Sequence, residues 1–303
     1  MTLTRGFLIL DKPEGLSSAA LVAKVRWRFG RKLKVGHAGT LDPQASGILP
    51  LALGEATKAI SYIATDIKTY TFDLVWGESR TTDDLEGEVV ETSLVRPTPG
   101  QIEAALEHFT GDYDQIPPIY SAIFVDGKRA YALARAGVAP ELAARRVHVS
   151  CLRLVKTQGD VSTFEVTCGA GFYVRSLARD LAKHLGSCGH ARHIRRTQVG
   201  PFTEKDALSI EKLEILPQID LIREYVRSLE CVLDDIPALS FADSDEKKLM
   251  AGQALCVTKA FGERGIDPCA SAQEVVCKSD SGLIFALATL AGGVVKPRRI
   301  LMY

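Results

Sequence analysis

An α+β fold is predicted by the way apolar residues and turn residues are distributed along the chain. Residues 68–77 alternate apolar and polar side chains, as expected of a half-buried strand. Residues 147–156 and 161–168 are predicted to form two further strands around a turn at Gly159 and Asp160. Capped helical segments occur between strands but do not follow each of them, which argues against a regularly alternating α/β architecture.

The N-terminal segment contains a strand, a helix and a second strand in that order. Residues 7–10 are apolar, and either Ser17 or Ser18 then caps a helix that stops at Gly30. Residues 48–53 are predominantly apolar, as expected of a buried strand.

Two more helices are predicted in the middle of the chain, over residues 99–109 and 172–185, each followed by a glycine. Between them, residues 120–125 lead into Asp126 and Gly127, a pair typical of a hairpin or turn. Beyond residue 236 the pattern changes to short apolar strands and glycine-rich turns without a long helix. We therefore expect two domains, residues 1–236 and a small β-rich module over residues 237–303.

The composition is that of a globular protein. Of the 303 residues, 46% are hydrophobic, and no apolar run approaches the ~20 residues of a membrane span. The start of the chain lacks a signal-peptide layout. The seven cysteines are scattered, odd in number and without a C-x-x-C pair, which fits reduced thiols in a cytoplasmic protein.

Positive charge is concentrated in two stretches although the net charge is zero. Residues 1–50 carry eight Lys and Arg against three acids, residues 51–130 carry six against fourteen, and residues 131–210 carry twelve against six. Each basic stretch alone is more simply interpreted as a solvated helix face. Together, flanking a rigid acidic loop, the two stretches favour a nucleic acid as partner.

That loop, residues 36–47, is rich in turn formers and presents a single carboxylate, that of Asp42. Its glycines permit backbone conformations that a Cβ disfavours, and Pro43 pushes Asp42 toward an extended conformation. A stiff loop carrying one carboxylate suits a site that handles a ligand at short range. An ordinary surface loop has a similar composition, so residues 36–47 alone leave both interpretations open.

Three other candidate chemistries have weaker support. Residues 169–171 (Gly-Ala-Gly) lie between a strand and a helix but lack the third glycine of a dinucleotide fingerprint. Cys188, His190 and His193 offer three zinc ligands without a fourth, beside arginines that disfavour a cation, so a basic polar loop is the preferred interpretation. No partner carboxylate for Asp42, as a glycosidase would need, is evident in the sequence.

Besides residues 36–47, six short motifs stand in a definite order along the chain. They are Asp11-Lys12-Pro13-x-Gly15-x-Ser17-Ser18, Gly54-Glu55-Ala56-Thr57-Lys58, Lys68-Thr69-Tyr70, Pro117-Pro118-x-Tyr120-Ser121-Ala122, Gly127-Lys128-Arg129-Ala130-Tyr131 and Gly171-Phe172-Tyr173-Val174-Arg175-Ser176-Leu177-Ala178-Arg179-Asp180-Leu181. Together they resemble the motifs of the bacterial tRNA pseudouridine-55 synthase family, with residues 36–47 matching its catalytic signature. Several motifs in the same order are far more specific than any one of them.

The resemblance implies a mixed, largely antiparallel sheet flanked by helices, with a small C-terminal RNA-binding domain of the PUA type. It implies isomerisation of uridine to pseudouridine at position 55 in the T-loop of tRNA, in which the ribose C1′ leaves nitrogen 1 of uracil and joins carbon 5. It implies no cofactor and no metal. The implied partner is the T-arm stem-loop of tRNA, with no membrane and no obligate protein partner, and the enzyme is expected to be a cytoplasmic monomer.

The resemblance also assigns roles to single residues. Asp42 is implied as the catalytic nucleophile or base, and Arg175 as the residue that pairs with it and keeps it ionised, where the residues alone would allow a helix-surface arginine. Tyr70 matches a stacking tyrosine that assists proton transfer at carbon 5, although an aromatic in an alternating strand is usually core. His37 matches a histidine near the displaced bases. The other residues implied at the substrate are Lys12, Gly39, Leu41, Tyr173 and Ile194.

The basic stretches and Lys12 are expected to contact RNA phosphates. The candidates within the stretches are Lys24, Arg26, Arg28, Arg195 and Arg196, and Lys128 and Arg129 are candidates outside them. The chain departs from the family pattern at Ala38, Arg80-Thr81, Phe124, Gly169-Ala170 and Phe172. These departures remove polar or basic contacts from the expected RNA surface, but none of them touches Asp42, Tyr70 or Arg175.

Overall fold

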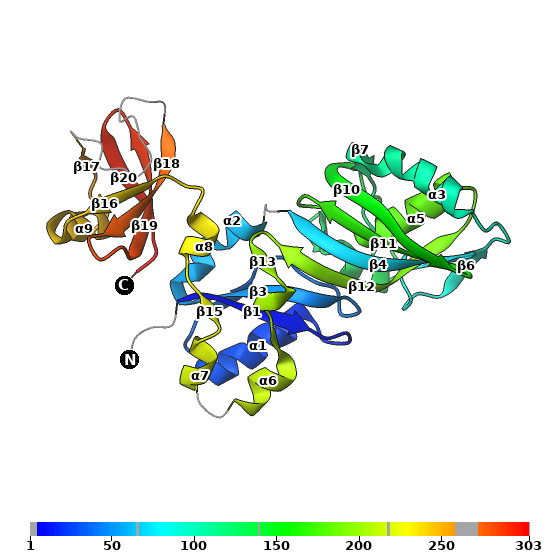
Figure 1. The fold of residues 1–303 in the computed structure, drawn as a ribbon, viewed down its shortest axis with the longest axis horizontal. Coiled ribbons are helices and arrows are strands. Elements are labelled where there is room, and N and C mark those ends of the chain that lie inside the picture. Colours follow the sequence, from blue (N-terminus) through cyan, green and yellow to red (C-terminus); the bar gives the residue numbers. More distant parts are fainter. Residues whose placement is uncertain (1–4, 65–66, 139, 217–218, 258–271, 303) are drawn as a thin grey trace.

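The structure, a computed structural model, describes residues 5–64, 67–138, 140–216, 219–257 and 272–302. Over these ranges the strands form a large eleven-stranded sheet, a separate five-stranded sheet near the C-terminus and two short hairpins (Figure 1). Helices cover parts of the large sheet, which confirms the α+β prediction. No helix of the described ranges is both long and apolar enough to span a membrane.

The large sheet has the strand order β14-β1-β3-β12-β4-β11-β10-β7, with β2, β13 and β15 paired to β3, β12 and β1. Its strands are β1 (Gly6–Lys12), β2 (Val35–His37), β3 (Ser46–Leu53), β4 (Lys68–Trp76), β7 (Gly111–Gln115), β10 (Arg145–Gln158), β11 (Val161–Cys168), β12 (Gly189–Val199), β13 (Phe202–Thr203), β14 (Leu208–Ser209) and β15 (Val226–Arg227). The pairs β1–β14 and β12–β3 are parallel, while β1–β3, β12–β4, β4–β11, β11–β10 and β10–β7 are antiparallel. The sheet is therefore mixed and largely antiparallel, as expected.

Most helices pack on one face of this sheet and enclose the main hydrophobic core. On this face lie α1 (Ser18–Phe29), α3 (Pro99–Leu106), α5 (Val174–His184), α6 (Ile210–Ile215) and α7 (Ile219–Arg223). The other face of β1 and β3 is covered by the 3₁₀ segment Gly54–Ala59, α2 (Ile60–Ala64) and α8 (Glu230–Leu233). The remaining short elements are β5 (Glu78–Arg80), β6 (Val89–Thr92), β8 (Phe124–Val125), β9 (Lys128–Arg129), α4 (Ala130–Arg135) and the 3₁₀ turns Glu107–Phe109 and Glu204–Asp206.

Local sequence signals account for several of these boundaries. The Ser17 hydroxyl accepts a hydrogen bond from the Ala20 amide at 3.1 Å and caps α1, which ends at Gly30 with φ +98°. Asp126 and Gly127 both have positive φ and turn β8 into β9, as a two-residue hairpin requires. Helix α5 begins at Val174, two residues later than predicted from Phe172.

Strand β12 is the main correction to the sequence-based expectation. The segment around His190 and His193 is not a basic polar loop but lies at the centre of the sheet between β3 and β4. Its pairing with β4 is interrupted by two bulges, and His193 has a φ of +48°. These irregularities interrupt the alternation of apolar and polar residues by which a strand is identified in a sequence. The segment that contains the two histidines therefore has the sequence pattern of a loop.

The C-terminal sheet has the order β16-β18-β19-β20-β17 and carries one short helix that the sequence did not predict. Its elements are β16 (Ala238–Phe241), α9 (Asp243–Met250), β17 (Leu255–Cys256), β18 (Gln273–Ser279), β19 (Ile284–Ala291) and β20 (Val294–Ile300). Leu287 and Leu301 join a hydrophobic cluster with Ile63 of α2 and Leu233 of α8. In addition, the Lys58 ammonium donates a hydrogen bond to the Ile300 carbonyl at 2.6 Å, so this sheet packs on the helical segments that cover the other face of β1 and β3.

Candidate active site

Asp42 lies in the loop between β2 and β3, and both sides of this loop are anchored to the N-terminal segment. The Pro43 carbonyl accepts hydrogen bonds from the Gly15 amide at 2.8 Å and from the Lys12 ammonium at 2.9 Å. On the other side, the Ser18 hydroxyl accepts from the Leu41 amide at 2.9 Å and donates to the Leu41 carbonyl at 3.0 Å. The Asp42 side chain is 45% exposed, so a fixed backbone presents a carboxylate to solvent.

Arg175, the second residue of α5, forms an ion pair with this carboxylate from the opposite side. Its Nη2 lies 2.7 Å from Asp42 Oδ2, and its own side chain is only 5% exposed. A buried guanidinium at this distance holds the solvent-facing carboxylate in one rotamer. The structure thus brings together two residues that lie far apart in the sequence.

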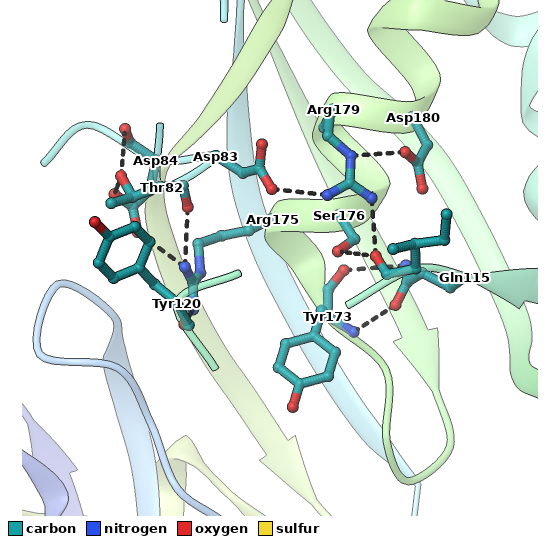
Figure 2. Close-up of polar contacts among 11 residues, drawn as sticks. Thr82, Asp83, Asp84, Gln115, Tyr120, Tyr173, Arg175, Ser176, Arg179 and Asp180 are labelled. Carbon is teal, nitrogen blue, oxygen red and sulfur yellow. Dashed lines mark hydrogen bonds and ion pairs between the residues drawn. The ribbon is translucent and has the colours of Figure 1, made fainter. Parts of the chain in front are cut away.

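Arg175 is itself held by groups from two other segments. Its Nη1 donates to the Thr82 carbonyl at 2.9 Å and lies 3.5 Å from Asp84 Oδ2, while Nη2 also donates to the Tyr120 carbonyl at 3.0 Å (Figure 2). Asp84, whose side chain is 9% exposed, was not identified from the sequence. Nothing in its turn-rich acidic segment marks Asp84 as a residue of the site, because its partner Arg175 lies on a helix far away in the sequence.

Two tyrosines stand near the carboxylate. Tyr70 of β4 is half-buried and packs against the main core, and burial raises the pKa of its hydroxyl, with the negative charge of Asp42 adding to the increase. Burial likewise raises the pKa of Tyr173, again with a contribution from Asp42. The backbone of Tyr173 is fixed by the Gln115 amide, which donates to its carbonyl at 3.1 Å and accepts from its N–H at 2.9 Å.

The other residues expected at the substrate differ in accessibility. Leu41 and Ile194 are buried members of the main core, with 4% and 8% exposure, in the cluster that Tyr70 packs against. His37 is half-buried on β2, and burial together with the charge of Arg196 lowers its pKa. Gly39 has a φ of +92°, which accounts for glycine at that position.

Lys12 is placed differently from its expected position at a phosphate. The residue is completely buried, and its ammonium donates to the carbonyls of Pro13, Leu16 and Pro43 at 2.7–2.9 Å. Burial lowers the pKa of Lys12 to about 8, against the attraction of the nearby carboxylates of Asp42 and Glu14. All three donors of the ammonium are thus used inside the protein, and Lys12 supports the Asp42 loop.

Arg196 is also internal. It is 1% exposed, and its guanidinium donates to the Ile48 carbonyl at 2.8 Å and the Gly39 carbonyl at 3.2 Å. Its backbone lies so close to Gly47 that a Cβ there would stand 2.2 Å from the Arg196 carbonyl oxygen. The prediction that Arg196 contacts phosphate is therefore wrong for this conformation, because the strand that carries it is central in the sheet.

The remaining predicted phosphate contacts fall into two groups. Three have partners within the protein: Arg195 pairs bidentately with Asp11 and also with Glu204, Lys24 pairs with Glu214, and Arg28 donates to the Leu216 carbonyl. The other three are exposed: Arg26 on α1, Lys128, and Arg129, whose guanidinium also donates to the Ala122 carbonyl at 2.5 Å and lies 4.2 Å from the centre of the Phe124 ring. The three exposed residues are better placed to contact the phosphates of a nucleic acid.

No cluster of three or more His, Cys, Asp or Glu with the arrangement of a metal site occurs among the residues that the structure describes. His190 is 1% exposed and its Nδ1 lies 2.9 Å from the Glu78 carbonyl oxygen, while Cys188 is buried at 6% exposure. Both side chains are therefore packed in the interior at the start of β12.

Replacing Lys12 with methionine is expected to destabilise the protein by roughly 3 kcal/mol or more, because three partly buried carbonyls lose a charged donor. Thermal unfolding followed by circular dichroism measures the effect. The matched control is Lys32→Met, since Lys32 is exposed and is expected to change stability by less than about 0.5 kcal/mol. Equal melting temperatures for the two variants would contradict the supporting role.

Comparison with known proteins gives consistent results over the whole chain. The family model described as "TruB family pseudouridylate synthase (N terminal domain)" matches residues 26–174, and the model described as "tRNA pseudouridylate synthase B C-terminal domain" matches residues 175–234. The tRNA pseudouridine synthase B of Caulobacter sp. (strain K31) is 45% identical over 296 residues, covering 97% of this chain and 95% of the relative. That of Rhodospirillum rubrum is 41% identical with 97% and 96% coverage.

Solved structures share the fold. A chain of a Cbf5–Nop10–Gar1 complex aligns with a TM-score of 0.71 at 23% identity, covering 99% of this chain and 85% of that one. A chain of an H/ACA RNP bound to a substrate RNA containing 2′-deoxyuridine aligns with a TM-score of 0.73 at 21% identity, covering 99% and 86%. At these identities the similarity establishes the arrangement of the elements.

Proposed function

The chain belongs to the TruB family of pseudouridylate synthases, and on that premise we propose that it converts uridine to pseudouridine at position 55 in the T-loop of tRNA. The curated relatives, which match nearly the full length, are named tRNA pseudouridine synthase B. The observation that carries the assignment of the site is the solvent-facing Asp42 carboxylate held at 2.7 Å by the buried Arg175 guanidinium.

In the proposed reaction, Asp42 acts as nucleophile or base toward the ribose–uracil unit. The bond between C1′ and nitrogen 1 breaks, and the uracil turns over within the site. A bond between C1′ and carbon 5 then forms, carbon 5 loses its proton, and nitrogen 1 gains one. The product is an isomer of the substrate, so the atoms balance without a co-reactant. Arg175 holds the Asp42 carboxylate in place for this role.

The aromatic residues near Asp42 are proposed to receive the target base. A uridine inside a folded RNA loop must leave its stack, at a cost of a few kcal/mol. Stacking on an aromatic ring stabilises a bound base by about 1–3 kcal/mol. Tyr70 and Tyr173 are proposed to make this contact. The pocket around the base is proposed to be lined by His37, Gly39, Leu41 and Ile194. The Tyr70 hydroxyl is proposed to assist removal of the proton from carbon 5.

We assign the wider RNA contact to the exposed basic residues Arg26, Lys128 and Arg129, whose side chains are accessible to phosphates. Residues 1–236 are proposed as the catalytic domain and residues 237–303 as a PUA-like RNA-binding domain, since the second sheet begins at Ala238. The enzyme is proposed to act as a cytoplasmic monomer on the T-arm of tRNA, without a cofactor or an obligate protein partner.

Tritium release tests the function directly. A tRNA transcript carrying 5-tritiated uridine is expected to lose one equivalent of tritium to water when the purified protein is added. A transcript in which the uridine at position 55 is replaced by cytidine is the control and is expected to release none. Binding without release would favour an RNA-binding factor, and free uracil as the product would favour a hydrolase. Either result would contradict the proposed reaction.

A further inference from the structure

Two arginines one turn apart on α5 join the same two segments of the chain. Arg175 contacts the Thr82 carbonyl on one side and the Tyr120 carbonyl on the other, as described above. Arg179 repeats this arrangement. Its Nη1 donates to Asp83 Oδ2 at 2.8 Å (Figure 2). Its Nη2 donates to the Ile116 carbonyl at 2.8 Å. Each of the two side chains thus connects residues 82–84 to residues 116–120.

Each segment has further contacts that position it on the helix or the sheet. The Ser176 hydroxyl also donates to the Ile116 carbonyl, at 2.8 Å. On the other side, the Ala191 amide of β12 donates to the Asp83 carbonyl at 3.0 Å. The Arg179 guanidinium is in turn oriented by Asp180, whose Oδ1 accepts from Nε at 2.9 Å. Each of the three nitrogens of the Arg179 guanidinium therefore makes a hydrogen bond.

The conformation of Asp83 depends on this contact. Its φ of +59° lies in the left-handed region, which a residue with a Cβ adopts at an energetic cost. Its side chain is only 15% exposed, and burial raises the pKa of the carboxyl, whereas the positive charges of Arg179 and Arg175 oppose that increase. Without Arg179, a buried carboxylate would lose its ion-pair partner, and turning it toward water would move the backbone.

Movement of Asp83 would reach the catalytic centre because its two neighbours both contact Arg175. Thr82 supplies the carbonyl acceptor and Asp84 supplies the buried carboxylate, and the Thr82 hydroxyl also donates to Asp84 Oδ1 at 2.5 Å. Arg175 in turn holds Asp42 at 2.7 Å. A displacement of about 1 Å at a catalytic group can cost on the order of 10²-fold in rate.

We propose that Arg179 is a positioning residue for pseudouridine formation: its ion pair with Asp83 fixes residues 82–84, and thereby the orientation of Arg175 against Asp42. The inference rests on the proposed function of this same site. It assigns to Arg179 no contact with the RNA or with the reacting atoms.

A double-mutant cycle tests this inference. Arg179→Gln and Asp83→Asn are each expected to lower kcat for tritium release about tenfold, with KM for tRNA changed less than twofold. The double variant is expected to lose about tenfold as well, and not a hundredfold, because both changes break the same contact. Arg179→Lys, which keeps the charge but not the fork of donors, is expected to fall between the wild type and Arg179→Gln.

Arg153→Gln serves as the matched control, since Arg153 forms a cross-strand ion pair with Glu165 on the exposed side of β10 and β11. It is expected to keep kcat, KM and the melting temperature of the wild type. If Arg179→Gln unfolds at the assay temperature, Asp83→Asn, which keeps the size of the side chain, decides the question by the same kcat and KM criteria.

Unchanged kcat in the soluble variants, equal losses in kcat and affinity, or fully additive losses would each overturn the positioning role. The proposed function is judged separately by the wild type. If the wild type releases no tritium, that function fails. If it does release tritium while the Arg179 and Asp83 variants match it, only the present inference fails.

Discussion

Replacing Asp42 with asparagine is expected to abolish tritium release from tRNA, with a loss in kcat on the order of 10⁴-fold or more. The amide keeps the shape of the side chain and one oxygen that can accept from Arg175, but it lacks the negative charge needed of a nucleophile or base. Because the Asp42 side chain is 45% exposed, the change in folding stability is expected to stay within about 1 kcal/mol. Single-turnover kinetics and thermal unfolding measure the two effects.

The same variant separates catalysis from binding. Arg26, Lys128 and Arg129 are exposed and unchanged in this variant, so filter binding is expected to give the affinity of the wild type for tRNA. The matched control is Asp220→Asn, an exposed aspartate that pairs with Arg223 and is expected to keep full activity. Tritium release by Asp42→Asn at the wild-type rate would show that Asp42 takes no part in the reaction. Loss of tRNA binding by this variant would instead show that Asp42 acts in RNA recognition.

Replacing Tyr70 with phenylalanine is expected to produce the second-largest effect, a decrease in kcat of about 10²- to 10⁴-fold. The ring remains, so its packing in the core and its stacking surface are preserved. The hydroxyl is lost, and with it the group proposed to assist proton removal from carbon 5. Burial raises the pKa of Tyr70, so the hydroxyl of the wild type stays protonated at neutral pH. Its proposed role is therefore that of a relay, which passes its own proton on as it accepts the proton from carbon 5.

A substrate isotope effect checks this assignment for Tyr70. If proton removal at carbon 5 becomes limiting in the phenylalanine variant, transcripts with deuterium at carbon 5 are expected to react more slowly than unlabelled ones. Tyr225→Phe is the control, because Tyr225 is a half-buried tyrosine that contacts Lys212 outside the site. Wild-type kcat for Tyr70→Phe would leave the ring with a stacking role alone.

Much of the local structure could be predicted because it depends on near neighbours in the chain. The alternation over residues 68–77 matches β4, where Phe72, Leu74 and Trp76 are buried on one face. The helix expected to end at Gly30 does so with φ +98° at that glycine. Strand β12 could not be predicted, because its bulges and the left-handed His193 arise from pairing with β3 and β4 at once.

The positions of the charged groups show the limit of prediction most clearly. Arg196 and Lys12 are basic residues like the exposed Lys128, yet both are buried and donate to carbonyls within the protein. Whether a basic side chain is solvated or paired depends on acceptors that include groups distant in the sequence, here the Pro43 carbonyl for Lys12 and the Ile48 carbonyl for Arg196. A count of charges along the chain therefore predicted a polyanionic partner but not which residues remain free to meet it.

The sequence by itself determined that Asp42 stands on a stiff loop, and its motifs indicated the family and the reaction. Glycine and proline act through their own backbone dihedrals, so the shape of such a loop is encoded locally. Only the tertiary structure decided that Arg175 meets Asp42 at 2.7 Å, that Asp84 lies behind it, and that Arg179 braces the same segment through Asp83. The physical reason is that an ion pair requires two groups within a few ångströms, and that proximity is created by packing α5 against loops far from it in the sequence.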